Sequence, residues 1–287
     1  MRTGNKLENP PKVRLIAFGA GLDGIENVLA RLRNQAKVFP LIDEVRIYTD
    51  KDLTAEYHQH FKEFPQKYPK GYGLWSWKPW LVSRELDLMP DGDILLYVDA
   101  GVELNPKGLG RFSYYLDLAS RAGFVFFSLN LQNRFWTKHD TGLVTRENYF
   151  RNQVAATAFF IQVSDKSREF AKEWLQLCSW EAGSHLLDPI SHSGETLEFQ
   201  HRHDQSILSS VVFKNEISVL DRDETYHQPW RQGRSYPLLA FRNKTGTTLV
   251  GTHLSPLPFG EFRKLIKLIG DKTFRARLLK RLLSPKS

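Results

Sequence analysis

The chain has 287 residues, of which 41% are hydrophobic and 25% charged, a balance typical of a folded globular protein. Its single cysteine, Cys178, excludes an intrachain disulfide and favours a reducing compartment. The sequence opens without the apolar core of a signal peptide, and it contains no apolar run near the ~20 residues that span a bilayer. We therefore expect a cytoplasmic protein.

The formal net charge of +8 is concentrated at the C-terminus. Residues 261–287 contain nine Lys or Arg and two acids, and the rest of the chain is nearly neutral. A nucleic-acid-binding surface needs basic residues along a whole face, so no nucleic-acid partner is expected. Apolar residues recur between these cations, as in a helix that lies on an anionic membrane surface or one that packs on the body of the protein. Both alternatives stay open, and the first makes the protein peripheral on the inner face of the membrane.

Strands and helices alternate along the first half of the chain. Apolar runs predict strands at 12–18, 45–49, 94–98 and 123–128. Helical spacing of apolar residues predicts helices at 25–36, 53–64, 76–88 and 109–120. This alternation predicts an α/β fold with a mainly parallel, Rossmann-like sheet covered by helices.

The second half of the chain is less regular. Residues 129–153 are polar and loop-like, a strand is expected at 155–163, and Ser164 can cap a helix through Leu177. Residues 180–200 and 221–258 are irregular, with a helix that begins near His203 and a strand at 217–220 between them. Because no linker or repeat interrupts the chain, we expect one domain over residues 1–258 and a basic amphipathic helical tail over 259–287.

Asp99 follows the apolar run 94–98, which reads as a strand buried on both faces. In open α/β sheets, ligands bind outside the carboxyl ends of the strands, so this acid is placed to meet a substrate or a metal ion. The alternative is a strand-ending turn, for which Asp-Ala-Gly is also suitable. The aromatic block that precedes the strand favours the binding site.

That aromatic block contains Trp75, Trp77 and Trp80, together with Tyr72 and Lys78. Tryptophan faces stack on the apolar faces of sugars and bases. Trp77 and Trp80 share one face of the predicted helix, so we assign them to packing. Trp75 and Lys78 belong either to the binding site or to the same packing, and both alternatives stay open.

Glycines at 19, 21 and 24 lie between the first strand and the first helix, with the spacing of a dinucleotide-binding turn. In that motif an acid follows ~20 residues later and holds the ribose. Here the acid that ends the second strand is Asp50, and the connection is longer. A glycine-rich first loop also suits a nucleotide-sugar site, in which Gly19 and Gly21 line the base pocket and Asp50 binds the base or ribose.

The segment 201–209 places His201, Arg202, His203, Asp204 and Gln205 immediately before and inside a predicted helix start. An acid in the first helical turn is favoured by the helix dipole, so capping is one reading of Asp204. The other reading is functional, because a carboxylate beside imidazoles can orient an acceptor hydroxyl or act as a base. Arg202 can hold a phosphate at the same place.

Two later histidines, His227 and His253, lie in irregular segments. Either can complete a metal shell that begins at Asp99, although a lone histidine is more often structural. These three residues are the metal ligands that the sequence suggests.

Three segments resemble a known family: Gly71-Tyr-x-x-Trp-x-Trp-Lys-Pro, Asp91-Gly-Asp-Ile-Leu-Leu-Tyr-x-Asp-Ala-Gly101, and His201-Arg-His-Asp-Gln-Ser-Ile-Leu-Ser209. They are similar to a group of microbial proteins of the nucleotide-diphospho-sugar transferase superfamily, whose fold is the glycosyltransferase GT-A fold. The resemblance runs from about Val13 to Leu220. More distantly, the chain resembles family 8 glycosyltransferases, whose Asp-x-Asp strand end and Asp-Gln helix start match 99–101 and 204–205.

In family 8, the two acids of the Asp-x-Asp motif and a late histidine bind a manganese ion that holds the sugar diphosphate. The resemblance therefore implies Mn²⁺ or Mg²⁺ as a cofactor. This sequence departs from the motif, because Gly101 stands where the second acid is expected. Glu103 is a candidate substitute, and Arg or Lys side chains are another.

The resemblance implies a hexosyltransferase-like enzyme of polysaccharide biosynthesis, which moves a sugar from a nucleotide-diphosphate donor to a glycan or lipid-linked acceptor. The residues that it assigns to donor binding are Gly19, Gly21, Asp50, Trp75, Lys78, Asp99, Gly101 and Arg202, and those assigned to catalysis are His203, Asp204 and Gln205. Two alternatives stay open. One is a non-catalytic nucleotide-sugar or glycan-binding protein of the same fold, and the other is a dinucleotide-dependent oxidoreductase.

Overall fold

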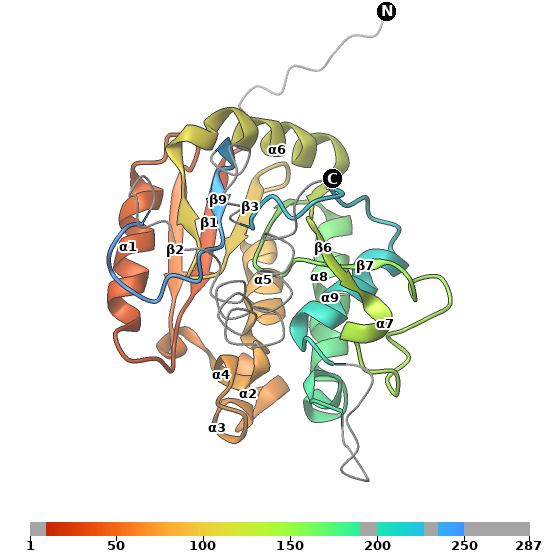
Figure 1. Cartoon of the computed structure of the whole chain (residues 1–287). Coiled ribbons are helices and arrows are strands. Elements are labelled where there is room, and N and C mark those ends of the chain that lie inside the picture. Colours follow the sequence, from red (N-terminus) through yellow and green to blue (C-terminus); the bar gives the residue numbers. More distant parts are fainter. Residues whose placement is uncertain (1–9, 190–199, 227–234, 250–287) are drawn as a thin grey trace, which may run out of the picture.

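A five-stranded sheet forms the centre of the protein. The computed structural model describes residues 10–189, 200–226 and 235–249. The sheet has the order β2-β1-β3-β8-β5, with β1 at Val13–Phe18, β2 at Glu44–Tyr48, β3 at Ile94–Val98, β5 at Phe124–Val125 and β8 at Ala158–Gln162. Strands β2, β1 and β3 are parallel, and β8 is antiparallel to both of its neighbours, so β5 runs with the first three. The predicted mainly parallel sheet is confirmed (Figure 1).

Strand β3 lies at the middle of the sheet, and both of its faces are buried. All five of its side chains are 0% exposed. Ile94, Leu96 and Val98 pack into one hydrophobic cluster, and Leu95 and Tyr97 pack into another, as the two-residue period of a strand requires. A strand that is buried on both faces has an unbroken apolar sequence rather than an alternating one.

Helices cover both faces of this sheet (Figure 1). One face is covered by α1 (Ile25–Lys37) and α6 (Leu109–Ala122), and the other by α2 (Ala55–Phe61), α5 (Trp77–Leu88), α8 (Asp165–Ser179) and α9 (Asp204–Lys214). Ser164 caps α8, as predicted, by accepting a hydrogen bond from the backbone N–H of Ser167. Pro79 lies in the first turn of α5, where its missing N–H is tolerated.

The other elements are short. They are the helices α3 (Phe64–Lys67), α4 (Gly71–Leu74) and α7 (Asn133–Trp136), the 3₁₀ helices η1 (Asp50–Asp52), η2 (Pro106–Gly108) and η3 (Trp180–Leu186), and two small sheets. In these sheets β4 (Glu103–Leu104) pairs with β9 (Leu238–Leu239), and β6 (Ser128–Gln132) pairs with β7 (Asn152–Val154).

Several expected elements are wrong in detail. The apolar run 123–128 divides between β5 and β6, and residues 129–153 form α7 and most of a hairpin instead of a loop. Buried polar side chains bond to one another here, as in the hydrogen bond from Asn133 Nδ2 to Asn148 Oδ1, so polarity misled the prediction. Leu220 belongs to no strand and makes a single bridge to Phe127. The helix expected at 53–64 ends at Phe61, because Lys62 has a φ of 36°.

The predicted tail at 259–287 lies outside the described residues, as do 190–199 and 227–234. Within the described parts of the chain, the helices are all too short or too polar to cross a membrane.

Arg31 of α1 fixes the chain beyond the end of β3. Its guanidinium is buried and donates to the carbonyl oxygens of Ala100 (2.7 Å) and Val102 (3.0 Å). Glu103 Oε1 lies 4.0 Å from the same group. A buried arginine that satisfies two carbonyl groups holds the residues around Asp99 in one conformation.

We expect Arg31→Lys to lower the free energy of unfolding by about 2 kcal/mol, because lysine cannot reproduce the two-pronged contact and leaves a buried carbonyl unpaired. Urea unfolding followed by tryptophan fluorescence measures this change. Arg33→Lys is the matched control, since Arg33 is exposed on the same helix. Equal stabilities of the two variants would contradict the anchoring role.

Candidate functional site

Lys78, Asp99 and Asp204 meet at the end of the central strand. Asp99 follows β3, Lys78 lies in the first turn of α5, and Asp204 begins α9. Lys78 Nζ lies 2.9 Å from Asp204 Oδ2 and 3.4 Å from Asp99 Oδ1, and it donates to the Ala156 carbonyl oxygen at 3.0 Å. Segments more than 100 residues apart in the sequence thus share one ammonium group.

Two effects disfavour the positive charge of the Lys78 ammonium. Its side chain is 3% exposed, so it has lost hydration, and it lies at a helix N-terminus, where a positive charge is disfavoured. Burial opposes its charge, but the carboxylates of Asp204 and Asp99 outweigh burial and raise the pKa of Lys78 above its ordinary value. Lys78 is therefore a permanent cation of the site.

Asp204 is the carboxylate of this site whose charged form is disfavoured by burial. Burial raises its pKa to about 6, and the charge of Asp99 contributes, although the Lys78 ammonium opposes the shift. Its Oδ2 atom is buried and faces the Lys78 ammonium at 2.9 Å. Asp204 is thus mainly ionised at pH 7, and it lines the cavity described below.

Asp99 is held differently. Tyr97 donates its hydroxyl to Asp99 Oδ1 at 2.6 Å, and burial together with this carboxylate raises the pKa of Tyr97 well above its ordinary value. The Asp99 side chain is 36% exposed. Its second oxygen can therefore face a solute while the first is fixed by Tyr97 and Lys78.

The three residues open onto a cavity of about 750 Å³. Its walls come from six segments: 18–28 after β1, 69–78, 99–102, 156–157, 200–205 and 240–244. This is the place at which open α/β sheets bind ligands, and the volume is within the range of small-molecule sites.

Four residues in these walls, Tyr72, Trp75, His203 and Arg242, have positive φ angles between 51° and 61°. Non-glycine residues adopt this conformation at a cost, and such residues concentrate at functional sites. Their gathering around one cavity supports its identification as the functional site.

Trp75 and His203 form an aromatic wall. Their rings stack with centroids 5.6 Å apart. His203 Nε2 lies 2.9 Å from Lys70 Nζ and can only accept from that ammonium, so Nδ1 donates to the carbonyl oxygen of Leu186. Burial lowers the pKa of His203, so this imidazole is neutral at pH 7. Gly71 is required beneath this wall, since a Cβ there would lie 2.5 Å from the Trp75 ring.

Of the other residues in segment 201–205, one has a structural role and two line the cavity. His201 donates from Nε2 to the His185 carbonyl oxygen and accepts from the backbone N–H of Lys138, and burial lowers its pKa to about 3, so it is a structural residue. Gln205 lines the cavity and donates to Gln153 Oε1 at 2.7 Å. Arg202 also lines it, with its guanidinium 4.4 Å from the centre of the Trp136 ring.

The glycine turn lines the cavity but is shaped by packing. A Cβ at Gly19 would lie 2.8 Å from the Ile25 side chain, and one at Gly21 would lie 3.1 Å from the Tyr72 ring. Asp50 begins η1 beyond the end of β2 and is exposed, and its charge raises the pKa of Tyr72 after the larger effect of burial. The structure therefore brings Gly19, Gly21 and Tyr72 to one end of the cavity, with Asp50 close by.

The position of the missing second acid is filled by backbone. A Cβ at Gly101 would lie 2.9 Å from Arg242 Cα, and the Asn243 N–H donates to the Gly101 carbonyl oxygen at 3.0 Å. Glu103 does not replace this acid, because its side chain is fully buried and accepts hydrogen bonds from Asn243 Nδ2 and from the backbone N–H of Leu249.

The described part of the chain contains no group of three or more His, Cys, Asp or Glu side chains arranged to hold a metal ion. His227 and His253 lie outside the described residues. Of the three ligands that the sequence suggests, the described residues supply Asp99 alone, and a single carboxylate does not by itself fit a divalent cation.

Sequence reasoning missed Arg242 and Lys244, which line the cavity. They lie in the segment 221–258, for which the sequence predicts no regular structure, and its described residues are irregular apart from β9. An irregular segment has no periodicity that points a side chain in any direction, so no signal in the sequence identifies these residues.

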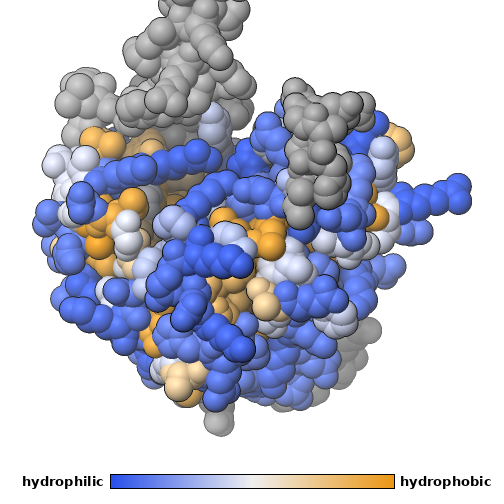
Figure 2. Space-filling model, turned by 90° about the horizontal axis from the view of Figure 1, so that it is seen from below, coloured by the Kyte–Doolittle hydropathy of each residue, from blue (hydrophilic) through white to orange (hydrophobic). Residues whose placement is uncertain are grey.

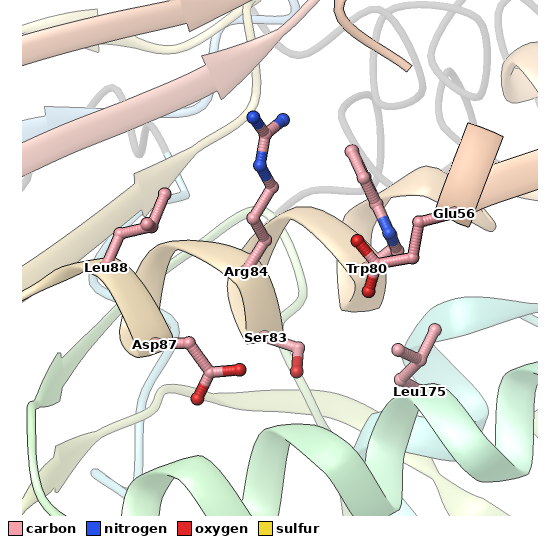
Figure 3. Close-up of a pocket in the computed structure, with 7 residues that line it drawn as sticks. All are labelled: Glu56, Trp80, Ser83, Arg84, Asp87, Leu88 and Leu175. Carbon is pink, nitrogen blue, oxygen red and sulfur yellow. The ribbon is translucent and has the colours of Figure 1, made fainter. Parts of the chain in front are cut away.

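A second cavity, of about 280 Å³, is lined by α5 together with one residue each of α2 and α8. Figure 3 shows Trp80, Ser83, Arg84, Asp87 and Leu88 of α5, with Glu56 of α2 and Leu175 of α8 pointing toward this helix. Trp80 is fully buried, as its assignment to packing predicts. The face in Figure 2 is mainly hydrophilic, with hydrophobic residues in small groups.

A comparison with protein-family models found no match, and neither did a comparison with curated protein sequences. Solved structures give several matches. The chain is similar to a glycosyltransferase involved in the glycosylation of the major capsid of PBCV-1, with 12% identity and a TM-score of 0.43 over 84% of this chain and 94% of that one.

It is also similar to mouse xyloside xylosyltransferase 1, with 11% identity and a TM-score of 0.39 over 79% of this chain and 90% of that one. A third structure, an active-site mutant of LgtC, has 12% identity and a TM-score of 0.40 over 74% of each chain. With TM-scores below 0.5, these similarities do not decide the function, which is argued below from the residues of the cavity.

The raised pKa of Asp204 predicts a pH-dependent stability. In the folded state the Asp204 carboxyl group keeps its proton up to about pH 6, whereas the ordinary pKa of an aspartic acid is 3.8. Between these two pH values Asp204 is protonated in the folded state but ionised in the unfolded state. Its contribution to the free energy of unfolding therefore falls as the pH rises, by up to ~3 kcal/mol.

Urea unfolding of the wild type and of Asp204→Asn between pH 4 and pH 7 measures this contribution. We expect the stability of the wild type relative to the variant to fall with rising pH until about pH 6. Asp117→Asn, on the surface of α6, is the control and should show no such trend. A wild-type advantage that grows with pH would contradict the assignment.

Proposed function

We propose that this chain is a hexosyltransferase-like glycosyltransferase, which moves a sugar from a nucleotide-diphosphate donor to a glycan acceptor. The observation that carries this proposal is the pair of carboxylates, Asp99 and Asp204, held by one buried ammonium in the wall of a cavity of about 750 Å³. The resemblance of the surrounding segments to nucleotide-sugar transferases points the same way.

The cavity offers different chemistry at its different walls. Gly19, Gly21 and Tyr72 present backbone and an aromatic face, which suit a base and ribose. Arg202 and Arg242 present guanidinium groups, which suit phosphate oxygens. We therefore assign the nucleoside to the first wall and the diphosphate to the second, with the ribose near Asp99.

The aromatic wall supports the assignment of the transferred sugar. Trp75 lies beside His203 and close to the start of α9, and a tryptophan face stacks on the apolar face of a sugar ring. The neutral His203 imidazole and the Gln205 amide supply polar groups beside it. In this arrangement the anomeric carbon lies between the diphosphate and Asp204.

The reaction assigned to the site exchanges one bond for another. The acceptor hydroxyl oxygen bonds to the anomeric carbon, the bond from that carbon to the diphosphate oxygen breaks, and its electron pair leaves with the diphosphate. The hydroxyl proton passes to a base. Asp204 is placed for this role or for orienting the hydroxyl, because it lines the cavity and is mainly ionised above about pH 6.

We expect Asp99→Asn and Asp204→Asn each to lower kcat by at least ~100-fold while the fold is retained, because each removes a charge next to the reacting groups. The assay measures nucleoside diphosphate release and glycan product across panels of nucleotide-sugar donors and glycan acceptors. Asp117→Asn is the matched control, since it removes an exposed carboxylate on another helix.

Near-normal turnover in both variants would overturn the assignment. Donor binding without hydrolysis or transfer across the panels would favour the non-catalytic binding protein. Submicromolar binding of a nicotinamide dinucleotide, detected by its fluorescence, would favour the oxidoreductase. A lipid-linked acceptor and membrane contact through residues 261–287 stay predictions, since those residues lie outside the described part of the chain.

A further inference from the structure

We infer that Arg202 and Arg242, assisted by Lys244, hold the donor diphosphate in place of a divalent cation. This inference rests on the proposed function, because it concerns the leaving group of the same reaction. It follows from three features: backbone that fills the place of the second acid, carboxylates that are already paired, and guanidinium groups in the wall of the cavity that form no ion pair with a described carboxylate.

The first feature is the packing of segment 240–243 on Gly101. Arg242 Cα would be 2.9 Å from a Cβ at position 101, and Asn243 N would be 3.2 Å from it, so no side chain fits there without moving backbone. Asn243 fixes the segment by donating to the Gly101 carbonyl oxygen and to Glu103. The same packing that excludes an acid brings Arg242 to the edge of the cavity.

The second feature is the pairing of Asp99 and Asp204 with Lys78. A divalent cation on Asp99 would stand close to a buried ammonium that cannot move away, because Lys78 also donates to the Ala156 carbonyl oxygen. Because the Lys78 side chain is only 3% exposed, solvent screens its repulsion of a second cation poorly. Divalent Mg²⁺ and Mn²⁺ prefer several oxygen ligands, and Asp99 offers at most one carboxylate that is already shared.

The third feature is the set of cations that face the cavity without carboxylate partners. No ion pair with a described carboxylate is formed by Arg202, Arg242 or Lys244. Burial, and then the charge of Arg242, lowers the pKa of Arg202, which means that the two guanidinium groups repel each other. Two arginines that face one cavity can together bind a phosphate group.

The described wall of the cavity contains five cationic side chains and three carboxylates. The cations are Lys70, Lys78, Arg202, Arg242 and Lys244, and the carboxylates are Asp23, Asp99 and Asp204. His201 and His203 add no charge at pH 7, since burial lowers the pKa of each. An anionic ligand is therefore attracted to the cavity, and the diphosphate, which gains negative charge as the glycosidic bond breaks, is stabilised most in the transition state.

The test is calorimetric titration of the full chain with UDP, GDP, ADP, CDP and TDP, in excess EDTA and in Mn²⁺. We expect at least one of them to bind in EDTA with a Kd that Mn²⁺ changes by less than ~3-fold. Arg202→Gln and Arg242→Gln should each weaken this binding by at least ~10-fold, without changing the affinity for the corresponding nucleoside, which lacks the phosphates.

Arg121→Gln is the control, because Arg121 is exposed on α6 and pairs with Asp117. A tightening of at least ~10-fold by Mn²⁺ in the wild type overturns the inference, and so does wild-type affinity in both arginine variants. The metal comparison uses the wild type alone, so it decides the question even if a variant is unstable.

The two proposals fail differently. If a nucleoside diphosphate binds only with Mn²⁺, the inference is wrong and the proposed function stands. If none of the five binds in either buffer, the proposed function fails and the inference fails with it.

Discussion

The buried ammonium of Lys78 is the group on which the site depends. Two carboxylates and one carbonyl oxygen surround it, and each comes from a different part of the chain. A buried ion pair of this kind is costly to assemble, because desolvation offsets much of the Coulomb attraction. Buried ion pairs of this kind are often found at functional sites, because desolvation and neighbouring charges shift the pKa of a side chain toward the pH at which the protein works. Asp204, with its pKa of about 6, shows this shift.

Several other contacts fix the positions of these charged groups. Arg31 holds the backbone after Asp99, Tyr97 fixes one oxygen of that carboxylate, and Trp174 donates its indole N–H to the backbone carbonyl of Asp204. The residues with positive φ around the cavity are conformationally unfavourable, so packing elsewhere in the structure must offset the free energy that they cost. A rigid and charged wall of this kind is preorganised, which is the main requirement for stabilising a developing negative charge.

The parts of the fold and site that could be predicted from sequence have a local signal. The run Ile94–Val98 is apolar because both faces of β3 are buried, and its end therefore locates Asp99. The start of α9 near His203 was expected from a helical pattern, and the structure begins this helix at Asp204. The assignment of Trp77 and Trp80 to the core agrees with their burial.

The remaining features arise only from contacts between distant segments. Gly101 identifies a departure from a motif, but its cause, the backbone of Arg242, lies about 140 residues away. Glu103 was a reasonable substitute for the missing acid by spacing, yet the strand pairing of β4 with β9 buries it beside Asn243. Arg242 and Lys244 follow no periodic pattern, so only the fold could show that they share a cavity with Arg202.

The most direct test of this account is a crystal structure of the chain with the nucleoside diphosphate that binds most tightly, grown in the presence of Mn²⁺. The account predicts a base beside Gly21 and Tyr72, phosphate oxygens within hydrogen-bonding distance of Arg202 and Arg242, and Lys78 still between Asp99 and Asp204. A nucleotide bound outside this cavity, or a metal ion that bridges Asp99 and the diphosphate, would contradict it.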